Sequence, residues 1–167
     1  MTLVIAFVVA CLLHVALRAA AVWWFLAACQ PLLLVPVAAS RKYTPVGVAR
    51  WGLAAGLAID VLSGRIIGPG GIAVAAAGAA VAVLVRRFEL AGPLFWIGGS
   101  LLAAVGSEAI WMVIYLTLNA PRDHSLLGSL ATVATTAAVA MAVAAGARIV
   151  VWWRSPQRRR RRELGRL

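Results

Sequence analysis

The chain has 167 residues, of which 63% are hydrophobic, a mean hydropathy of +0.95 and a formal net charge of +11. Soluble domains are about half apolar, and one this small could not bury so much apolar surface, so the composition excludes a soluble protein. The apolar runs are near-continuous and lack the two-residue alternation of barrel strands. The sequence therefore predicts an all-α integral membrane protein with one transmembrane bundle, residues 1–153, and a basic tail, residues 154–167.

The first apolar stretch runs from Leu3 to Ala39 and is interrupted by Arg18 and by the pair Gln30 and Pro31. Its length is short for two perpendicular crossings, which need about 20 residues each. We expect two crossings that are short, tilted or partly re-entrant, with the break at Arg18 or at Gln30 and Pro31.

Turn signals rich in Gly and Pro divide the rest of the chain into four apolar spans. Ser125 stands where the N-cap of the last span is expected. Together with the first stretch, these spans predict about six transmembrane helices. The four predicted spans are Val46 to Leu62, Ile72 to Val85, Leu94 to Leu118 and Leu126 to Trp153.

The distribution of Lys and Arg predicts the orientation. When the loops are assigned alternately to two sides, one side collects 13 of the 16 basic residues, seven of them in the tail, and the other side collects three. The basic side should be cytoplasmic by the positive-inside rule, and both termini lie on it. Outside the tail, the cytoplasmic set is Arg41, Lys42, Arg50, Arg86, Arg87 and Arg148; the opposite set is Arg18, Arg65 and Arg122.

A carboxylate, Asp60, ends the third predicted span and is followed by a glycine-rich turn. It can accept backbone N–H groups from the turn or from the next helix and so fix how two helices meet. A charged patch for an extracytoplasmic partner is an equal and compatible alternative. Gly52 and Gly56, four residues apart, allow close helix packing. Bulky residues in place of Gly64 or Gly68 in the turn should disrupt assembly.

Glu108 is the deepest ionisable residue of the predicted spans. Placing an ionisable side chain inside a membrane costs free energy, so such residues are candidates for a function. It can contact a partner helix or a ligand, or form a proton-linked site. The alternative is a structural carboxyl that is hydrogen-bonded within the bundle. His14, also on an apolar helix, is expected to be a satisfied polar group rather than a ligand.

The tail places a run of basic residues beside the last span. Such clusters bind anionic lipids. Nucleic-acid binding is the weaker alternative, because the sequence contains no recognisable nucleic-acid-binding domain. No phosphate loop, zinc-protease motif, nucleophile elbow or paired acidic metal motif is found, so we expect no enzyme activity and no cofactor. The candidate lipid contacts are Arg158, Arg159, Arg160, Arg161 and Arg162.

The stretch from Gln30 to Arg87 resembles MreD, the rod-shape-determining membrane protein family of bacteria. The family has a Pro-initiated Leu/Val-rich helix, matched by the run from Pro31 to Val35, and a glycine-rich helix ending in a pattern like GLxxDxLSGxxxG. Here that pattern is Gly56-Leu57-Ala58-Ile59-Asp60-Val61-Leu62-Ser63-Gly64, followed by Gly68. A small-residue helix that ends in basic residues follows. The family usually has an acidic residue after the proline, where this chain has Leu32.

The resemblance implies a non-enzymatic scaffold of the elongation machinery in the bacterial inner membrane. Its implied partners are MreC, the RodA glycosyltransferase with its class B penicillin-binding transpeptidase, and indirectly MreB. It also implies a bundle similar to the S components of energy-coupling-factor transporters. A transporter subunit that binds a small molecule is therefore the alternative function. Pro31, Ser63 and the Gly and Asp residues of the pattern are the implied interface or helix-packing residues.

Overall fold

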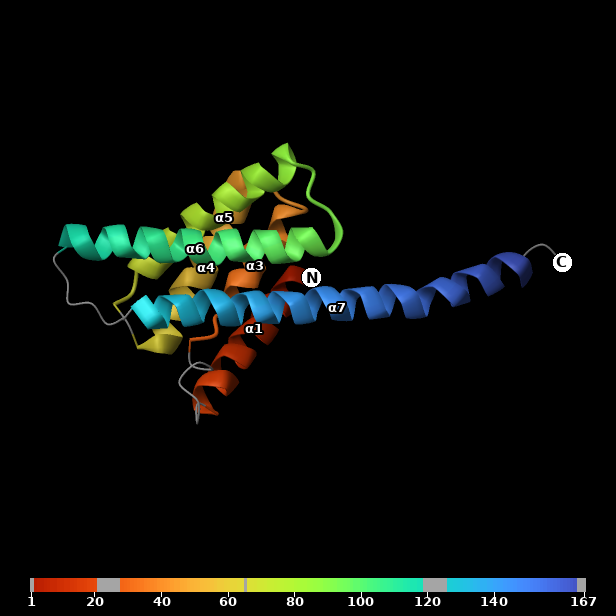
Figure 1. Cartoon of the computed structure of the whole chain (residues 1–167), viewed down its shortest axis with the longest axis horizontal. Helices are drawn as coiled ribbons and strands as arrows, with labels where there is room; N and C mark the ends of the chain where they lie inside the picture. Colours follow the sequence, from red (N-terminus) through yellow and green to blue (C-terminus); the bar gives the residue numbers. More distant parts are fainter. Residues whose placement is uncertain (1, 21–27, 65, 119–125, 165–167) are drawn as a thin grey trace.

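The computed structural model describes residues 2–20, 28–64, 66–118 and 126–164, with the side chains of residues 118, 126, 147 and 150–164 outside the description. Every regular element in these ranges is helical (Figure 1). The elements are α1 (Thr2–Ala19), the 3₁₀ turn η1 (Pro31–Leu33), α3 (Leu34–Ser40), α4 (Pro45–Ser63), α5 (Pro69–Arg87), α6 (Gly92–Leu118) and α7 (Leu126–Leu164).

Five helices in the described ranges are long and apolar enough to cross a membrane, which indicates a multi-pass membrane protein. They are α1, α4, α5, α6 and the apolar part of α7, Leu127–Gly146. The predicted all-α class and the four later spans are thereby confirmed. Helix α7 continues to Leu164, beyond the predicted end of the bundle at position 153. The basic segment therefore extends the last helix, at least as far as the backbone is described.

The second predicted crossing is a short helix, one of the forms expected for it. Pro31–Ser40, which joins η1 and α3, has 10 residues and a length of about 15 Å, half the thickness of the hydrocarbon core. Leu32, Leu33 and Val37 are completely buried. The described chain therefore has five full-length apolar helices and this short sixth one, which the others enclose. Both predicted breaks exist, since α1 ends at Ala19 and η1 begins at Pro31.

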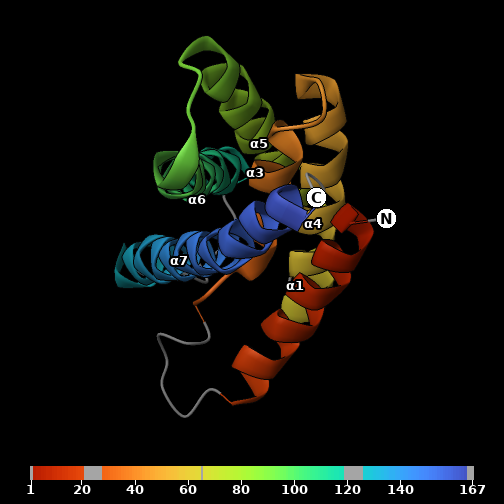
Figure 2. The same ribbon diagram turned by 90° about the vertical axis from the view of Figure 1, so that its right-hand side faces the viewer.

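Successive elements run in alternate directions between two ends of the bundle (Figure 1, Figure 2). The start of α1, residues 41–44, residues 88–91 and the C-terminal half of α7 lie toward one end. We call it the basic end, after Arg41, Lys42, Arg86 and Arg87. The end of α1, the turn between α4 and α5, the end of α6 and the start of α7 lie toward the other end. This turn end carries Gly64 and Gly68.

The core lies around the short helix. Leu32, Leu33 and Val35 cluster with Ala55 and Ile59 of α4 and with Val74 of α5 and Ala104 of α6. Helix α1 covers one side of this cluster and leaves a broad apolar face outside, where a bilayer would surround it. The exposed side chains of that face are Val4, Ile5, Val8, Val9, Leu12, Leu13 and Val15.

Candidate functional site

The closest helix contact that the glycines create is between α4 and α5. Gly52, Gly56 and Asp60 are spaced by four residues and so share one face of α4. A Cβ atom at Gly52 would lie 2.6 Å from the carbonyl oxygen of Val74, and one at Gly56 would overlap the carbonyl oxygen of Gly70. The two helix backbones therefore touch, as small residues allow in membrane proteins.

Asp60 completes this face and is fully buried, with none of its side chain exposed. Its Oδ2 atom accepts hydrogen bonds from the backbone N–H groups of Gly68 and Gly70, both at 3.0 Å. Gly68 is the N-cap residue of α5 and Gly70 lies in its first turn, where helix N–H groups lack intrahelical partners and the helix dipole favours a negative charge. Pro69 between them has no N–H to satisfy. The carboxylate of α4 thus caps α5, as the sequence predicts.

The capping geometry also explains a glycine that the sequence did not single out. A Cβ atom at Gly70 would overlap the carboxylate of Asp60. Gly70 is therefore required so that the carboxylate can approach the backbone. The same burial corrects the alternative prediction for Asp60, because a side chain with no exposed surface cannot form a charged patch for an outside partner.

Gly64 and Gly68 are needed for the path of the backbone. Gly64 ends α4 in the left-handed conformation, with φ 64°, and its N–H donates to the carbonyl oxygen of Val61 at 3.2 Å. Gly68 has φ 127°. No heavy atom lies within 4 Å of a Cβ built at either position. A side chain at either position would therefore be opposed by backbone strain rather than by a clash, and the expected effect on assembly stays a prediction.

Helix α1 reaches the same region through His14. This side chain is 1% exposed, and its Nε2 atom lies 3.5 Å from the hydroxyl of Ser63, at the limit of a hydrogen bond. Pro31 is buried at the start of η1, which packs against α4. Six of the predicted residues therefore lie along the face of α4 or in the turn that follows it, whereas Pro31 lies on a neighbouring element. The six are Gly52, Gly56, Asp60, Ser63, Gly64 and Gly68.

Glu108 lies apart from this region, on α6. Its Oε2 atom accepts a hydrogen bond from the hydroxyl of Ser129 on α7 at 2.8 Å, and the side chain is only partly buried. Trp111 and Tyr115 follow on the same side of α6 and stack with their ring centroids 5.0 Å apart. The predicted hydrogen bond within the bundle is present, and its donor Ser129 had not been anticipated.

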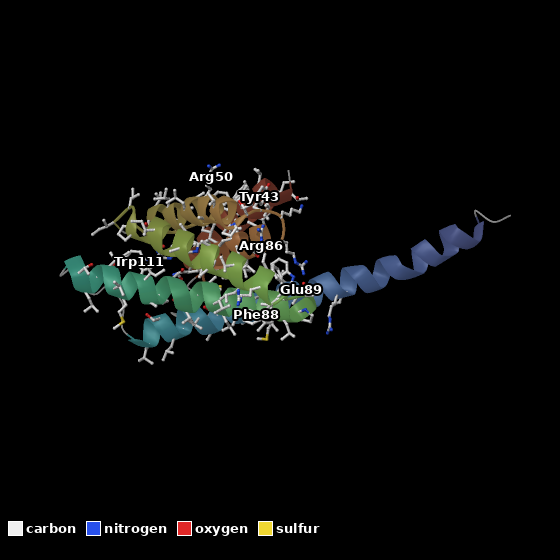
Figure 3. All side chains as sticks on the ribbon, turned by 90° about the horizontal axis from the view of Figure 1, so that it is seen from above. Tyr43, Arg50, Arg86, Phe88, Glu89 and Trp111 are labelled. Carbon is white, nitrogen blue, oxygen red and sulfur yellow. The ribbon has the colours of Figure 1, made fainter. Side chains whose placement is uncertain are left out.

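The basic end holds two arginines in place by contacts other than ion pairs. The guanidinium of Arg41 lies over the ring of Phe95, 4.2 Å from its centroid. Arg86 donates to the carbonyl oxygen of Tyr43 at 2.7 Å, and Figure 3 shows the two residues side by side. Arg158, Arg159, Arg160, Arg161 and Arg162 lie on the helix α7, and their side chains are outside the description.

Metal binding finds no support among the described residues, which contain no group of three or more His, Cys, Asp or Glu side chains placed to hold an ion. Cys11 and Cys29 are free thiols. Compared with known proteins, the chain matches no family model, no curated protein and no solved structure. The resemblance to MreD accordingly rests on the residues from Gln30 to Arg87.

Proposed function

We propose that the protein is a member of the MreD family and a non-enzymatic scaffold of the bacterial elongation machinery. The observation that carries the proposal is the capped hairpin formed by α4 and α5. The residues that the family pattern shares with this chain include Gly56, Asp60, Gly64 and Gly68. These are the residues that bring the two helices together, cap α5 and shape the turn.

A rigid hairpin suits a scaffold because its outer surface keeps one shape without a ligand. Apolar side chains on this surface are exposed, among them Val61 at 59% and Ile72 at 60%. In the proposal, this surface and its neighbours bind the transmembrane helix of MreC and the RodA–transpeptidase synthase, and connect indirectly to MreB. The bundle is proposed to resemble the S components of energy-coupling-factor transporters.

The proposed location is the bacterial inner membrane with both termini in the cytoplasm. Two observations support this orientation: α1 starts and α7 ends toward the basic end (Figure 1), and Arg41, Lys42, Arg86 and Arg87 lie there. Anionic lipid headgroups would meet these side chains and the basic continuation of α7, each basic residue contributing about 1 kcal/mol.

Co-purification in a gentle detergent from the native membrane, with mass spectrometry of the recovered proteins, tests the proposal. We expect MreC together with RodA or its transpeptidase. Recovery of a cytoplasmic ATPase module, or of a tightly held vitamin-like ligand, would instead support the alternative, a transporter subunit. Recovery of neither set from a well-folded preparation would leave the scaffold without its partners and contradict the proposal.

A further inference from the structure

The carboxyl of Glu108 lies deep in the apolar part of α6. The apolar segment runs from Gly92 to Thr117, and Glu108 is about 24 Å from its first residue and about 14 Å from its last at 1.5 Å per residue. It is thus in the half of the membrane nearer the turn end. An ionised side chain near the centre of a membrane-spanning helix is energetically costly, so its partners decide its role.

Glu108 has acceptor capacity that the described chain does not use. An ionised carboxylate offers about four lone-pair sites. Within the described ranges, the hydroxyl of Ser129 is the one donor to Glu108, and no Lys or Arg side chain forms an ion pair with it. Asp60 differs, because it is fully buried and accepts two backbone N–H groups. Part of the Glu108 side chain stays accessible in the described structure, so another molecule can reach its free acceptor sites.

The residues around Glu108 have the spacing of a helix-docking seam. On α6, alternate steps of four and three residues separate them, the repeat that presents one continuous stripe to a second helix. Three of the members are exposed apolar side chains, Leu101 at 37%, Val105 at 53% and Met112 at 43%. Glu108 and Tyr115 complete the stripe and are half-buried. We call Leu101, Val105, Glu108, Met112 and Tyr115 the α6 seam.

The chemistry at the centre of the seam selects the occupant. A carboxylate beside two stacked aromatic rings, Trp111 and Tyr115, favours an ammonium or guanidinium group, through charge and through cation–π attraction. We infer that the α6 seam binds a partner's transmembrane helix that carries a Lys or Arg side chain in the turn-end half of the membrane, paired with Glu108. The inference rests on the proposed scaffold function and adds the chemistry of one partner.

Site-specific photo-crosslinking in native membranes tests the seam. A photoreactive residue at Val105 or Met112 should crosslink one protein through its transmembrane segment. Val113 is the matched control, since it is 59% exposed but lies about 100° around the helix from Met112. Equal crosslinking at Met112 and Val113, or crosslinking to lipid alone, would overturn the inference.

Substitution of Glu108 tests the charge. Glu108→Gln keeps an acceptor for Ser129 and should lower recovery of the crosslinked partner at least about tenfold, because it leaves a buried cation unpaired. Ser129→Ala removes the internal donor and should leave recovery unchanged. Replacing the partner's Lys or Arg by Glu, in combination with Glu108→Lys, should restore recovery of the crosslinked partner. Unchanged recovery of the partner in Glu108→Gln, or an equal loss of recovery in Ser129→Ala, would show that the carboxyl only makes contacts within this chain. If the wild type recovers the elongation proteins and these variants do too, the inference fails while the proposed function stands.

Discussion

The two long helical hairpins of the bundle use their carboxyl groups in opposite ways. In α4–α5, glycines bring the backbones into contact, and the Oδ2 atom of Asp60 accepts hydrogen bonds from two N–H groups of the same chain. In α6–α7, Glu108 receives one hydroxyl and stays partly accessible. Several hydroxyls of α7 bond to their own helix instead, such as Thr132 to the carbonyl of Gly128 at 3.1 Å. The first pair is therefore closed by its own contacts, whereas the second keeps a polar group for another molecule.

The largest expected effect follows from Gly56→Leu. A side chain at this position must displace the backbone of Gly70, so the α4–α5 contact opens and the cap at Asp60 is lost with it. We expect a loss of about 3 kcal/mol or more, the upper range of overpacking. Thermal unfolding in detergent measures it. Gly98→Leu is the matched control, since a Cβ there meets no heavy atom within 4 Å; equal destabilisation by both changes would contradict the account.

Asp60→Ala should have the next largest effect. It leaves the N–H groups of Gly68 and Gly70 without their acceptor in a water-poor site, which costs about 2–3 kcal/mol. Asp60→Asn retains one acceptor oxygen and should fall between alanine and the wild type. The same unfolding measurement checks the order of stability of the three proteins. An alanine variant as stable as the wild type would show that the carboxylate does not stabilise the hairpin.

A smaller effect is expected for the turn glycines. Gly64→Ala places a methyl group in the left-handed conformation, at a cost of about 1–2 kcal/mol, without any clash. Gly64→Asn should recover part of the loss, because Asn tolerates that conformation. Comparison of the two unfolding midpoints separates strain from bulk: if bulk mattered, Asn would be the worse substitution.

The smallest effect is expected for Ser63→Ala. Its contact with His14 is 3.5 Å long, so its removal should cost less than about 1 kcal/mol. The change should leave the α4–α5 hairpin intact and loosen only the attachment of α1. Hydrogen exchange of α1 amides measures this; a global loss of protection would show that α1 is coupled to the whole bundle.

The comparison also shows what sequence reasoning could reach. The spans and one of the two roles considered for Asp60 were predictable, because apolar length and a carboxylate directly before a glycine-rich turn are local features. A short second helix was among the expected forms, but its complete burial was not predictable, since burial depends on helices from the rest of the chain. Gly70 and Ser129 were missed for the same reason: each matters because it contacts a carboxylate on another helix. The sequence of a single helix does not fix which of its residues lies opposite a given residue of its neighbour.

In the proposed function, the closed α4–α5 hairpin is the platform on which the elongation proteins assemble. The most direct test replaces the native copy with Gly56→Leu or Gly98→Leu at matched membrane levels and compares cell shape with recovery of MreC. The account predicts rod-shaped cells with normal recovery for Gly98→Leu, and rounded cells with lost recovery for Gly56→Leu. Rod-shaped cells with full recovery in Gly56→Leu would contradict it.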